Sequence, residues 1–345
     1  MDKGKNIALI DALKAIGIIL VVVGHNDTIL TKYIYSFHMP LFFLISGITF
    51  NESKWTDIRK FINSRFKSLL IPYFKYSIIL FIIWIPLDII KGVKINSHII
   101  LRNLYGILYS QGGLKYMAWG VPMWFLTCLF LISIGYFLIN KYFKSYRFEI
   151  LVLCVVIGYL TKFLPYRIPW SLDCAFIGIV FYGIGHIYRE KFLEFKFNIN
   201  TVRNKIVLVL LMVSLINLNN VNGRVDFYSN KFNNYVIFFI CAFIGIMILL
   251  IIGKNITNTR ALKVLKILSK NTLIILAFHI RILDGIKFLV IRILHLNLNF
   301  NSLILGAFIM PLIQIFILIY ITILIDKINR FKQLKKGNKE IYNYQ

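Results

Sequence analysis

A lysine and a histidine lie eleven residues apart in the first apolar stretch of the chain, ALIDALKAIGIILVVVGHND. In an α-helix, at about 100° per residue, Lys14 and His25 project from the same face, and Asp11 lies within about 40° of His25. The helical rise between Lys14 and His25 is about 16 Å. A neutral imidazole is suited to general base catalysis near pH 7, and a lysine can bind an anionic or polarised group. The spacing predicts a polar stripe with acid–base chemistry at one end of an apolar helix.

A second histidine, His38, follows in YSFHMPLFFLISGITF, which begins a few residues after the first stretch ends. The short connection makes the second helix return antiparallel beside the first, so His25 and His38 are predicted at similar depth near one surface. Pro40 falls in the first turns of this helix, where a missing N–H matters least. A single histidine is also typical of an interfacial anchor, and a single lysine can extend to the surface. Four polar residues on facing helices favour a functional site.

Three further residues are candidates for the same site. His279 lies in the apolar stretch NTLIILAFHIRIL, Asp173 opens a later apolar segment, and Trp124 lies in PMWFL at the start of another. A tryptophan at that position is equally typical of the aromatic belt of a membrane protein. The sequence shows no His, Asp or Glu spacing typical of a metal site, so no metal is predicted.

The elements that position these residues follow from the composition. Of the 345 residues, 59% are hydrophobic and 16% are charged, whereas a soluble domain is about a quarter charged. We predict an all-α polytopic transmembrane helix bundle, with one domain over 1–345 and spans between about 7 and 325. Ten apolar segments are predicted as spans, at about 7–26, 33–50, 70–90, 118–140, 148–164, 172–188, 206–219, 232–253, 271–294 and 302–325.

The distribution of lysine and arginine predicts the orientation of this bundle. Of the 40 such residues, 26 fall on the side of the N-terminus, nine on the other side and five inside spans. Positive residues gather on the cytoplasmic side, so both termini are predicted to be cytoplasmic, and 326–345 to be a basic cytoplasmic tail. The formal net charge of +26 is thereby explained by the lipid bilayer, and no nucleic acid partner is expected. We expect a multi-pass protein of the cell (plasma or inner) membrane.

Several motifs, in this order, resemble the membrane-bound acyltransferase-3 family over nearly the whole chain. They are IDALKAIGIILVVVGH, FHMPLFFLISG, RFKSLLIPY, PMWFLTCLFL and NTLIILAFH. The resemblance is to the sugar O-acetylase branch, similar to fucose 4-O-acetylases. It implies ten helices and transfer of an acyl group, usually acetyl from acetyl-CoA, to hydroxyls of surface or exported carbohydrates. The acyl-CoA is then a donor substrate, and no resident cofactor is implied.

The resemblance also assigns residues to roles. It places the family's histidine on His25 and its basic residue on Lys14. His25 is expected to be the general base on the acceptor hydroxyl, by direct attack or through an acetyl-histidine. Lys14 is expected to bind the pantetheine arm or the thioester oxygen. The other expected contacts are Arg65 and Lys67, in a basic loop over 51–69, to the phosphates of CoA, and His38, Trp124, Asp173 and His279 to the carbohydrate or glycolipid acceptor.

Two positions depart from the family pattern. Relatives commonly carry arginine where Lys14 stands, so the planar bidentate fork is absent here. Relatives also often show two arginines three residues apart, whereas Arg65 is followed at that spacing by Ser68, with Lys67 adjacent.

Two other functions fit the same pattern of spans. A transporter or flippase for a lipid-linked glycan or small solute would use the prolines inside several spans to break helices, but the paired repeats common in transporters are absent from the sequence. An acyltransferase-like protein that has lost catalysis is the other alternative. Incubation with radiolabelled acetyl-CoA, with and without glycans, discriminates the three.

Overall fold

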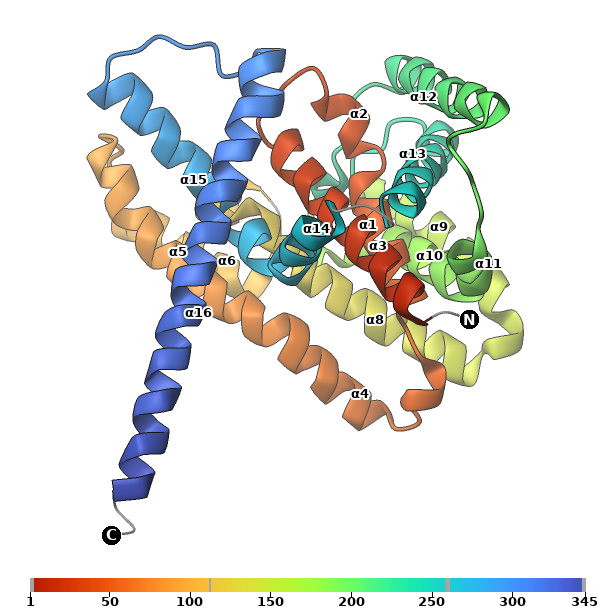
Figure 1. Cartoon of the computed structure of the whole chain (residues 1–345), viewed down its shortest axis with the longest axis horizontal. Coiled ribbons are helices and arrows are strands. Elements are labelled where there is room, and N and C mark those ends of the chain that lie inside the picture. Colours follow the sequence, from red (N-terminus) through yellow and green to blue (C-terminus); the bar gives the residue numbers. More distant parts are fainter. Residues whose placement is uncertain (1–2, 112, 258–260, 343–345) are drawn as a thin grey trace.

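The computed structural model describes the backbone of residues 3–111, 113–257 and 261–342, and side chains there apart from Lys3, Leu114, Asp326 and 328–342. Within these ranges the regular structure is helical, with one isolated β-bridge between Asp226 and Lys231. Figure 1 shows the helices in sequence order. The α-helices are α1 (Lys3–Gly24), α2 (Thr31–Tyr35), α3 (His38–Ile48), α4 (Ile58–Arg65), α5 (Ile71–Ile90), α6 (Ser97–Tyr109), α7 (Leu114–Met117), α8 (Trp124–Tyr142), α9 (Arg147–Leu160), α10 (Leu172–Ile187), α11 (Arg189–Glu194), α12 (Val202–Asn222), α13 (Tyr235–Ile256), α14 (Ala261–Lys270), α15 (Thr272–Phe288) and α16 (Met310–Tyr342).

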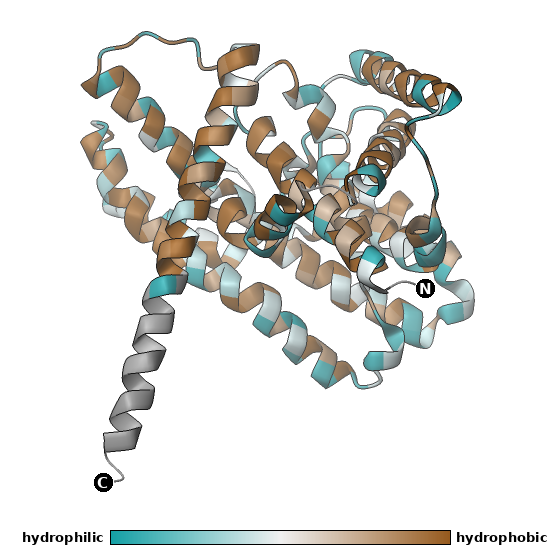
Figure 2. Cartoon of the chain, viewed as in Figure 1, coloured by the Kyte–Doolittle hydropathy of each residue, from teal (hydrophilic) through white to brown (hydrophobic). Residues whose placement is uncertain are grey.

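Seven helical stretches in the described part of the chain are long and apolar enough to cross a membrane. They include α1, α8, α10, α12 and α13, and Figure 2 shows apolar residues along the long helices with polar residues at their ends. The all-α membrane bundle predicted from the sequence is confirmed. The remaining three predicted segments correspond to α3, α9 and α15, which are not among these seven stretches. The total of ten spans and the cytoplasmic position of both termini stay predictions.

Helix α1 lies at the centre of the bundle, where several other helices pack against it. It packs against α3, α13, α14, α15 and α16, while α10 packs against α3, α8 and α9 (Figure 1). The buried faces of these helices form one large apolar core. By contrast, α12 packs mainly on α13 and exposes apolar residues such as Ile206, Val209 and Leu210. An exposed apolar face on a helix of this length is suited to contact with lipid.

Two glycines allow α3 and α10 to approach each other closely. A Cβ atom on Gly47 of α3 would lie 1.9 Å from the carbonyl oxygen of Tyr182, and a Cβ atom on Gly185 of α10 would lie 2.2 Å from that of Leu44. Each glycine therefore faces the backbone of the partner helix. Small residues at such contacts are typical of membrane helix pairs, because they let the backbones pack closely. Gly47 at the end of the second apolar segment is explained by this contact, whereas the hydroxyl of Ser46 donates to the carbonyl oxygen of Phe42 in its own helix.

The return of the chain after α1 is tight and places His38 at the first position of α3. The hydroxyl of Thr31 donates to the carbonyl oxygen of Gly24 across the turn, at 3.1 Å. Pro40 lies in the first turn of α3, as expected. Phe37, just before α3, packs directly over Gly245 of α13, where a Cβ atom would lie 2.2 Å from its ring. The entry of α3 is thereby fixed against both α1 and α13.

The basic loop predicted over 51–69 is instead mostly helical, so that expectation is corrected. Asp57 caps the start of α4 by accepting a hydrogen bond from the backbone N–H of Arg59 at 2.8 Å. From there α4 continues through a π-helical turn, Phe66–Leu70, directly into α5. The capping residue and the absence of a helix breaker before Pro72 explain why the helix continues, and the π-helical turn lies directly before Pro72, whose missing N–H interrupts the regular α-helical hydrogen bonds.

Candidate active site

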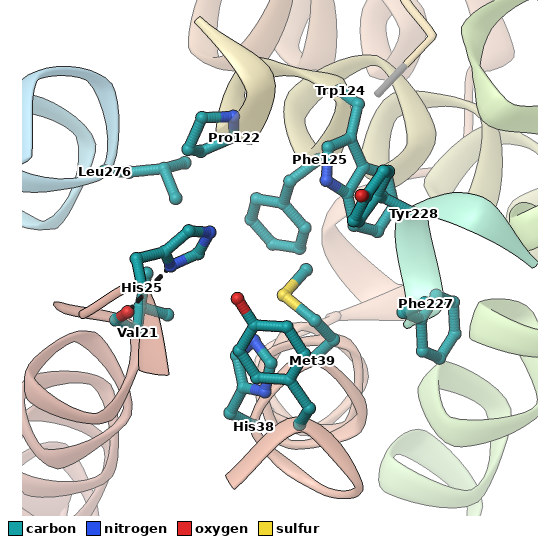
Figure 3. A pocket seen from close by; sticks show the side chains of 11 residues that line it. Val21, His25, His38, Met39, Pro122, Trp124, Phe125, Phe227, Tyr228 and Leu276 are labelled. Carbon is teal, nitrogen blue, oxygen red and sulfur yellow. Dashed lines mark hydrogen bonds between the residues drawn. The ribbon is translucent and has the colours of Figure 1, made fainter. Parts of the chain in front are cut away.

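His25, His38 and Trp124 line one small cavity, which we call the His25 cavity. Its volume is about 30 Å³, and Figure 3 shows the side chains around it. Residues from α1, α3, α8, α15 and the connection between α12 and α13 contribute to its walls. The lining residues are Val21, His25, Tyr35, His38, Met39, Pro122, Trp124, Phe125, Phe227, Tyr228 and Leu276.

The hydrogen bond of His25 defines which ring nitrogen can act as a base. Its Nδ1 lies 2.8 Å from the carbonyl oxygen of Val21, one turn earlier (Figure 3). A carbonyl oxygen only accepts, so Nδ1 carries the proton and the neutral ring keeps a lone pair on Nε2. In Figure 3 this second nitrogen faces the cavity. The end of α1 therefore presents an oriented proton acceptor to whatever occupies the cavity.

Tyr35 lies between the two histidines of the cavity. Its ring centroid is 5.8 Å from that of His25 and 5.0 Å from that of His38. His38 is 4% exposed, and its Nδ1 donates to the carbonyl oxygen of Ile34 at 2.9 Å. The Nε2 of neutral His38 is thus an acceptor as well, while the tyrosine hydroxyl can donate. Sequence reasoning missed Tyr35, although it stands three residues before His38.

His279 contacts the ring of His25 and does not line the His25 cavity. The two rings meet edge to face with centroids 4.8 Å apart. His279 is fully buried, and its Nδ1 donates to the carbonyl oxygens of Ile275 and Leu276, at 2.9 and 3.0 Å. Its Nε2 has no hydrogen-bond partner within the described part of the chain. The structure therefore places His279 behind His25, where it limits the orientations of the imidazole.

A pair of amides ties three helices together beside His25. The side-chain nitrogen of Asn26 donates to the Oε1 of Gln314 on α16 at 3.1 Å, and the Nε2 of Gln314 donates to the carbonyl oxygen of His279 at 2.8 Å. Asn26 is 2% exposed and Gln314 is fully buried. Both polar atoms of Gln314 are thus bonded, whereas the buried Oδ1 of Asn26 has no hydrogen-bond partner in the described part of the chain. The signal in the sequence is a glutamine, which carries no charge, inside an apolar segment.

Two further cavities continue from the His25 cavity along α1. The second, the Lys14 cavity, has a volume of about 170 Å³ and shares Val21, Met39, Phe125 and Leu276 with the first. The third, the Asp11 cavity, has a volume of about 290 Å³ and shares Lys14 with the second. The three are therefore adjacent and follow the polar stripe from Asp11 to His25. The stripe predicted from helical periodicity coincides with this row of adjacent cavities, which we call the path along α1.

Comparison with known proteins identifies the family of the chain. The family model described as "Acyltransferase domain", of the acyltransferase-3 family, matches residues 7–325. The chain belongs to the acyltransferase-3 family. No curated protein and no solved structure matches it. The resemblance inferred from the motifs is confirmed at the level of the family, which makes this multi-pass membrane protein an acyltransferase.

Lys14 of this acyltransferase lies in the middle of the path and remains available for a ligand. It lines the Lys14 and Asp11 cavities but not the His25 cavity. It forms no hydrogen bond or ion pair with any residue that the structure describes, although the Asp11 carboxylate attracts it. Asp11 itself accepts a hydrogen bond from the hydroxyl of Ser269 on α14 at 2.7 Å. Asp11 therefore has a structural partner, whereas the ammonium group of Lys14 faces two cavities.

The structure separates Trp124 from Asp173. Trp124 lines the His25 cavity and stacks on Phe227, with centroids 6.1 Å apart and planes 15° apart. Asp173 is 1% exposed and does not line that cavity. Its two oxygens accept hydrogen bonds from the guanidinium of Arg167, and one also accepts from the N–H of Cys174. With these partners, Asp173 fixes the start of α10 to the connection before it.

Arg65 and Lys67 also lie apart from the three cavities. Arg65 lies over the ring of Phe61, 5.0 Å from its centroid, and Lys67 is exposed. Neither lines the cavities along α1. Because 58–70 is helical, the two side chains cannot converge as they would in a flexible loop.

The connection between α12 and α13 closes the His25 cavity, which the sequence did not indicate. Arg224 pairs with Asp27 at 2.9 Å, lies near Asp226 at 3.5 Å, and stands over the ring of Tyr35 at 4.9 Å from its centroid. Burial raises the pKa of the Asp226 carboxyl, and Arg224 opposes that rise. Phe227 follows directly and lines the cavity. An ion pair between distant segments thus holds the aromatic wall in place.

Proposed function

We propose that this acyltransferase transfers an acetyl group from acetyl-CoA on the cytoplasmic side to a hydroxyl of a cell-surface or exported carbohydrate. The observation that carries the proposal is the row of three cavities along α1. It begins near the end that the charge distribution predicts to be cytoplasmic, and it ends at the free Nε2 of His25. A path of this kind lets a cytosolic donor meet an acceptor on the other side.

His25 is the general base in this proposal. Its Nε2 takes the proton from the acceptor hydroxyl as the hydroxyl oxygen attacks the thioester carbonyl carbon. The carbon–sulfur bond then breaks, and the imidazolium returns the proton to the departing thiolate. The hydroxyl of Tyr35, between His25 and His38, is placed to donate a hydrogen bond to the developing oxyanion. An acyl group carried on the same Nε2 would accomplish the transfer in two steps.

Lys14 binds the arm of the donor in this proposal, and not the reacting oxygen. Its α-carbon is about 16 Å from that of His25 along the helix axis, and it does not line the His25 cavity. The cavity around it is otherwise mostly apolar, with Ile18, Phe42 and Leu129 among its walls. One cation in an apolar passage suits the alternating amides and methylenes of a pantetheine chain.

The size of the His25 cavity supports a small acyl group. Its volume of about 30 Å³ is the smallest of the three cavities along α1, against about 170 and 290 Å³ for the others, which favours a short acyl chain beside His25. The stacked rings of Trp124 and Phe227 supply an apolar face, and His38 supplies an acceptor for a sugar hydroxyl. A sugar ring requires the wall formed by Phe227 and Tyr228 to move outwards.

The test measures transfer by purified protein in lipid nanodiscs, with radiolabelled acetyl-CoA and a panel of glycans. His25→Ala should lower turnover by at least about a hundredfold, the lower part of the range for general base catalysis. His38→Gln keeps a polar side chain and should act mainly on the KM for the acceptor. Retention of more than about a tenth of the wild-type turnover by His25→Ala would exclude His25 as the base.

The purified protein reconstituted into proteoliposomes distinguishes a transporter from a transferase. A flippase would move a labelled glycolipid across the membrane of a proteoliposome without acetyl-CoA. The His25→Ala variant would move it as the wild type does, because that movement would not depend on acyl transfer. Glycan movement without any acetylated product would overturn the proposed function.

A further inference from the structure

The largest cavity described lies at the N-terminal end of α1, beyond the Asp11 cavity. It is a cleft of about 1200 Å³ between the start of α1, the segment 193–200 and the end of α13. We call it the Asn198 cleft. We propose that this cleft binds the nucleotide end of the acyl-CoA, its adenine and phosphates, and this inference rests on the proposed function.

The cleft has the charge that a polyphosphate ligand requires. Lys5, Lys196 and Lys254 line it, against one acidic residue, Glu194. Arg189 lines the adjacent Asp11 cavity and adds a fourth cation on the way towards Lys14. Phosphate groups bind lysine and arginine through charge-assisted hydrogen bonds, which are stronger than neutral ones. The cations thus line both the cleft and the cavity between it and Lys14.

The cleft also offers an aromatic surface. Phe195 and Phe197 both line it, are half-buried, and have nearly parallel rings, 21° apart with centroids 6.0 Å from each other. Stacking on an aromatic ring stabilises a bound nucleobase, whichever base it is. The headgroup of an anionic lipid would use the lysines but has no base to stack. The pair of phenylalanines therefore favours a nucleotide over a lipid.

The segment that carries these rings is held firmly to α13. The side-chain nitrogen of Asn255 donates to the carbonyl oxygen of Phe197 at 3.1 Å, and its oxygen accepts from the N–H of Ile199 at 3.3 Å. Lys254 donates to the carbonyl oxygen of Leu193 at 2.5 Å. The walls of the cleft are thus positioned before a ligand arrives, which reduces the entropic cost of binding.

The cleft lies next to the path along α1. It shares Asn6 and Leu193 with the Asp11 cavity, which in turn shares Lys14 with the Lys14 cavity. Along α1, Asn6 and His25 are about 28 Å apart. A nucleotide bound in the cleft can therefore direct its flexible arm along one helix to the base. Arg65 and Lys67, the phosphate contacts expected from the sequence, line neither the cleft nor the path.

The experiment measures binding of adenosine 3′,5′-bisphosphate and of CoA to the full-length protein in nanodiscs of zwitterionic lipid. Lys196→Gln should raise the Kd for the bisphosphate by about tenfold, as expected for one lost charge-assisted contact. Phe195→Ala should raise it by at least about fivefold through lost stacking. Lys263→Gln, which removes an exposed cation of α14, is the matched control and should leave the Kd unchanged. The thermal midpoint of each variant checks that it is folded.

The outcomes separate this inference from the proposed function. Wild-type binding that is insensitive to Lys196→Gln and Phe195→Ala, or that is lost only in an Arg65→Gln/Lys67→Gln variant, overturns the Asn198 cleft while leaving acetyl-CoA as the donor. Displacement of the bisphosphate by anionic nanodisc lipid, with no effect of Phe195→Ala, identifies a headgroup site and also overturns it. Failure of the proposed function is recognised separately, because the wild type would then bind nucleotide yet transfer no acetyl group.

Discussion

The imidazole of His279 packs edge to face on the imidazole of His25, at 4.8 Å between centroids and 74° between planes. Both rings donate through Nδ1 to backbone carbonyl oxygens of their own helices. The contact joins α1 to α15 at the depth of the proposed base. Because His279 does not line the His25 cavity, its position implies that it orients His25 and does not touch substrate.

Replacement of His279 therefore should act on turnover more than on substrate binding. His279→Ala leaves space behind His25 and should lower kcat by about tenfold to a hundredfold, since small displacements of a catalytic group have effects of that size. His279→Phe fills the space and should recover part of the loss. Steady-state kinetics in both substrates provide the measurement. A raised KM for the acceptor with unchanged kcat would instead make His279 a substrate contact.

Lys14 should affect the donor and not the acceptor. Lys14→Ala removes the cation from the path along α1, and we expect the KM for acetyl-CoA to rise by at least about tenfold. Lys14→Arg keeps the charge and should be mild. Turnover measured at a range of acetyl-CoA concentrations, with saturating acceptor, checks this. Equal effects of Lys14→Ala on both KM values would contradict the assignment to the donor arm.

Gly47→Ala should destabilise the protein through the contact between α3 and α10. Its Cβ atom would lie 1.9 Å from a backbone oxygen, and relieving such overlap costs about 1–3 kcal/mol or more. Gly285→Ala is the matched control, because a Cβ atom there meets nothing within 4 Å. Thermal unfolding in detergent should show a lower midpoint for Gly47→Ala only. Equal midpoints for the two variants would mean that the helices separate without penalty.

The Glu52 carboxylate should make stability depend on pH in the acidic range. The amide of Asn140 donates to it at 2.8 Å and Lys144 pairs with it at 3.0 Å, and together they hold the pKa of Glu52 below its ordinary value of 4.5. A lowered pKa in the folded state gives stability that is present above the unfolded value and lost as pH falls through the folded value. Glu52→Gln should therefore flatten the decline in thermal midpoint below about pH 4.5.

The control for Glu52 is Glu149→Gln, at an exposed glutamate in the first turn of α9. The thermal midpoint of this variant should decline as the pH falls, as that of the wild type does. If Glu52→Gln also follows the wild-type curve, the contacts of Glu52 with Asn140 and Lys144 add nothing to stability.

Cysteine labelling tests the predicted orientation. Ser53, Ser145 and Asn299 are exposed, and the four native cysteines are buried. In a background with those cysteines replaced, an impermeant thiol reagent added to intact cells should label Asn299→Cys but not Ser53→Cys or Ser145→Cys. Labelling of Ser53→Cys from outside would reverse the orientation, and with it the side from which the donor enters.

The features predicted correctly from the sequence are those set by local pattern. The face shared by Lys14 and His25 follows from helical periodicity, and the short connection after α1 forces α3 to return beside it. These two facts were enough to predict that His25 and His38 lie near each other, and both line the His25 cavity. Trp124 joined them because it begins α8 on the same side.

The features that were missed depend on pairs of residues far apart in the sequence. Gln314 meets Asn26, Arg224 meets Asp27, and the segment 193–200 meets the end of α13 only in the folded chain. No periodicity within one segment reveals such pairs. The prediction of a loop over 51–69 was wrong for a different reason. Its charges suggested a solvated connection, whereas Asp57 caps α4 and no proline or glycine interrupts 58–70.

The apolar lining of the His25 cavity has a consequence for competing chemistry. A base that activates a sugar hydroxyl can equally activate water, and an acyl thioester beside it would then be hydrolysed. The apolar side chains of Pro122, Phe125 and Leu276 line this cavity, so they offer a water molecule no hydrogen-bond partner where the acetyl group of the proposed reaction would lie. The cavity walls thus favour a transferase over a thioesterase.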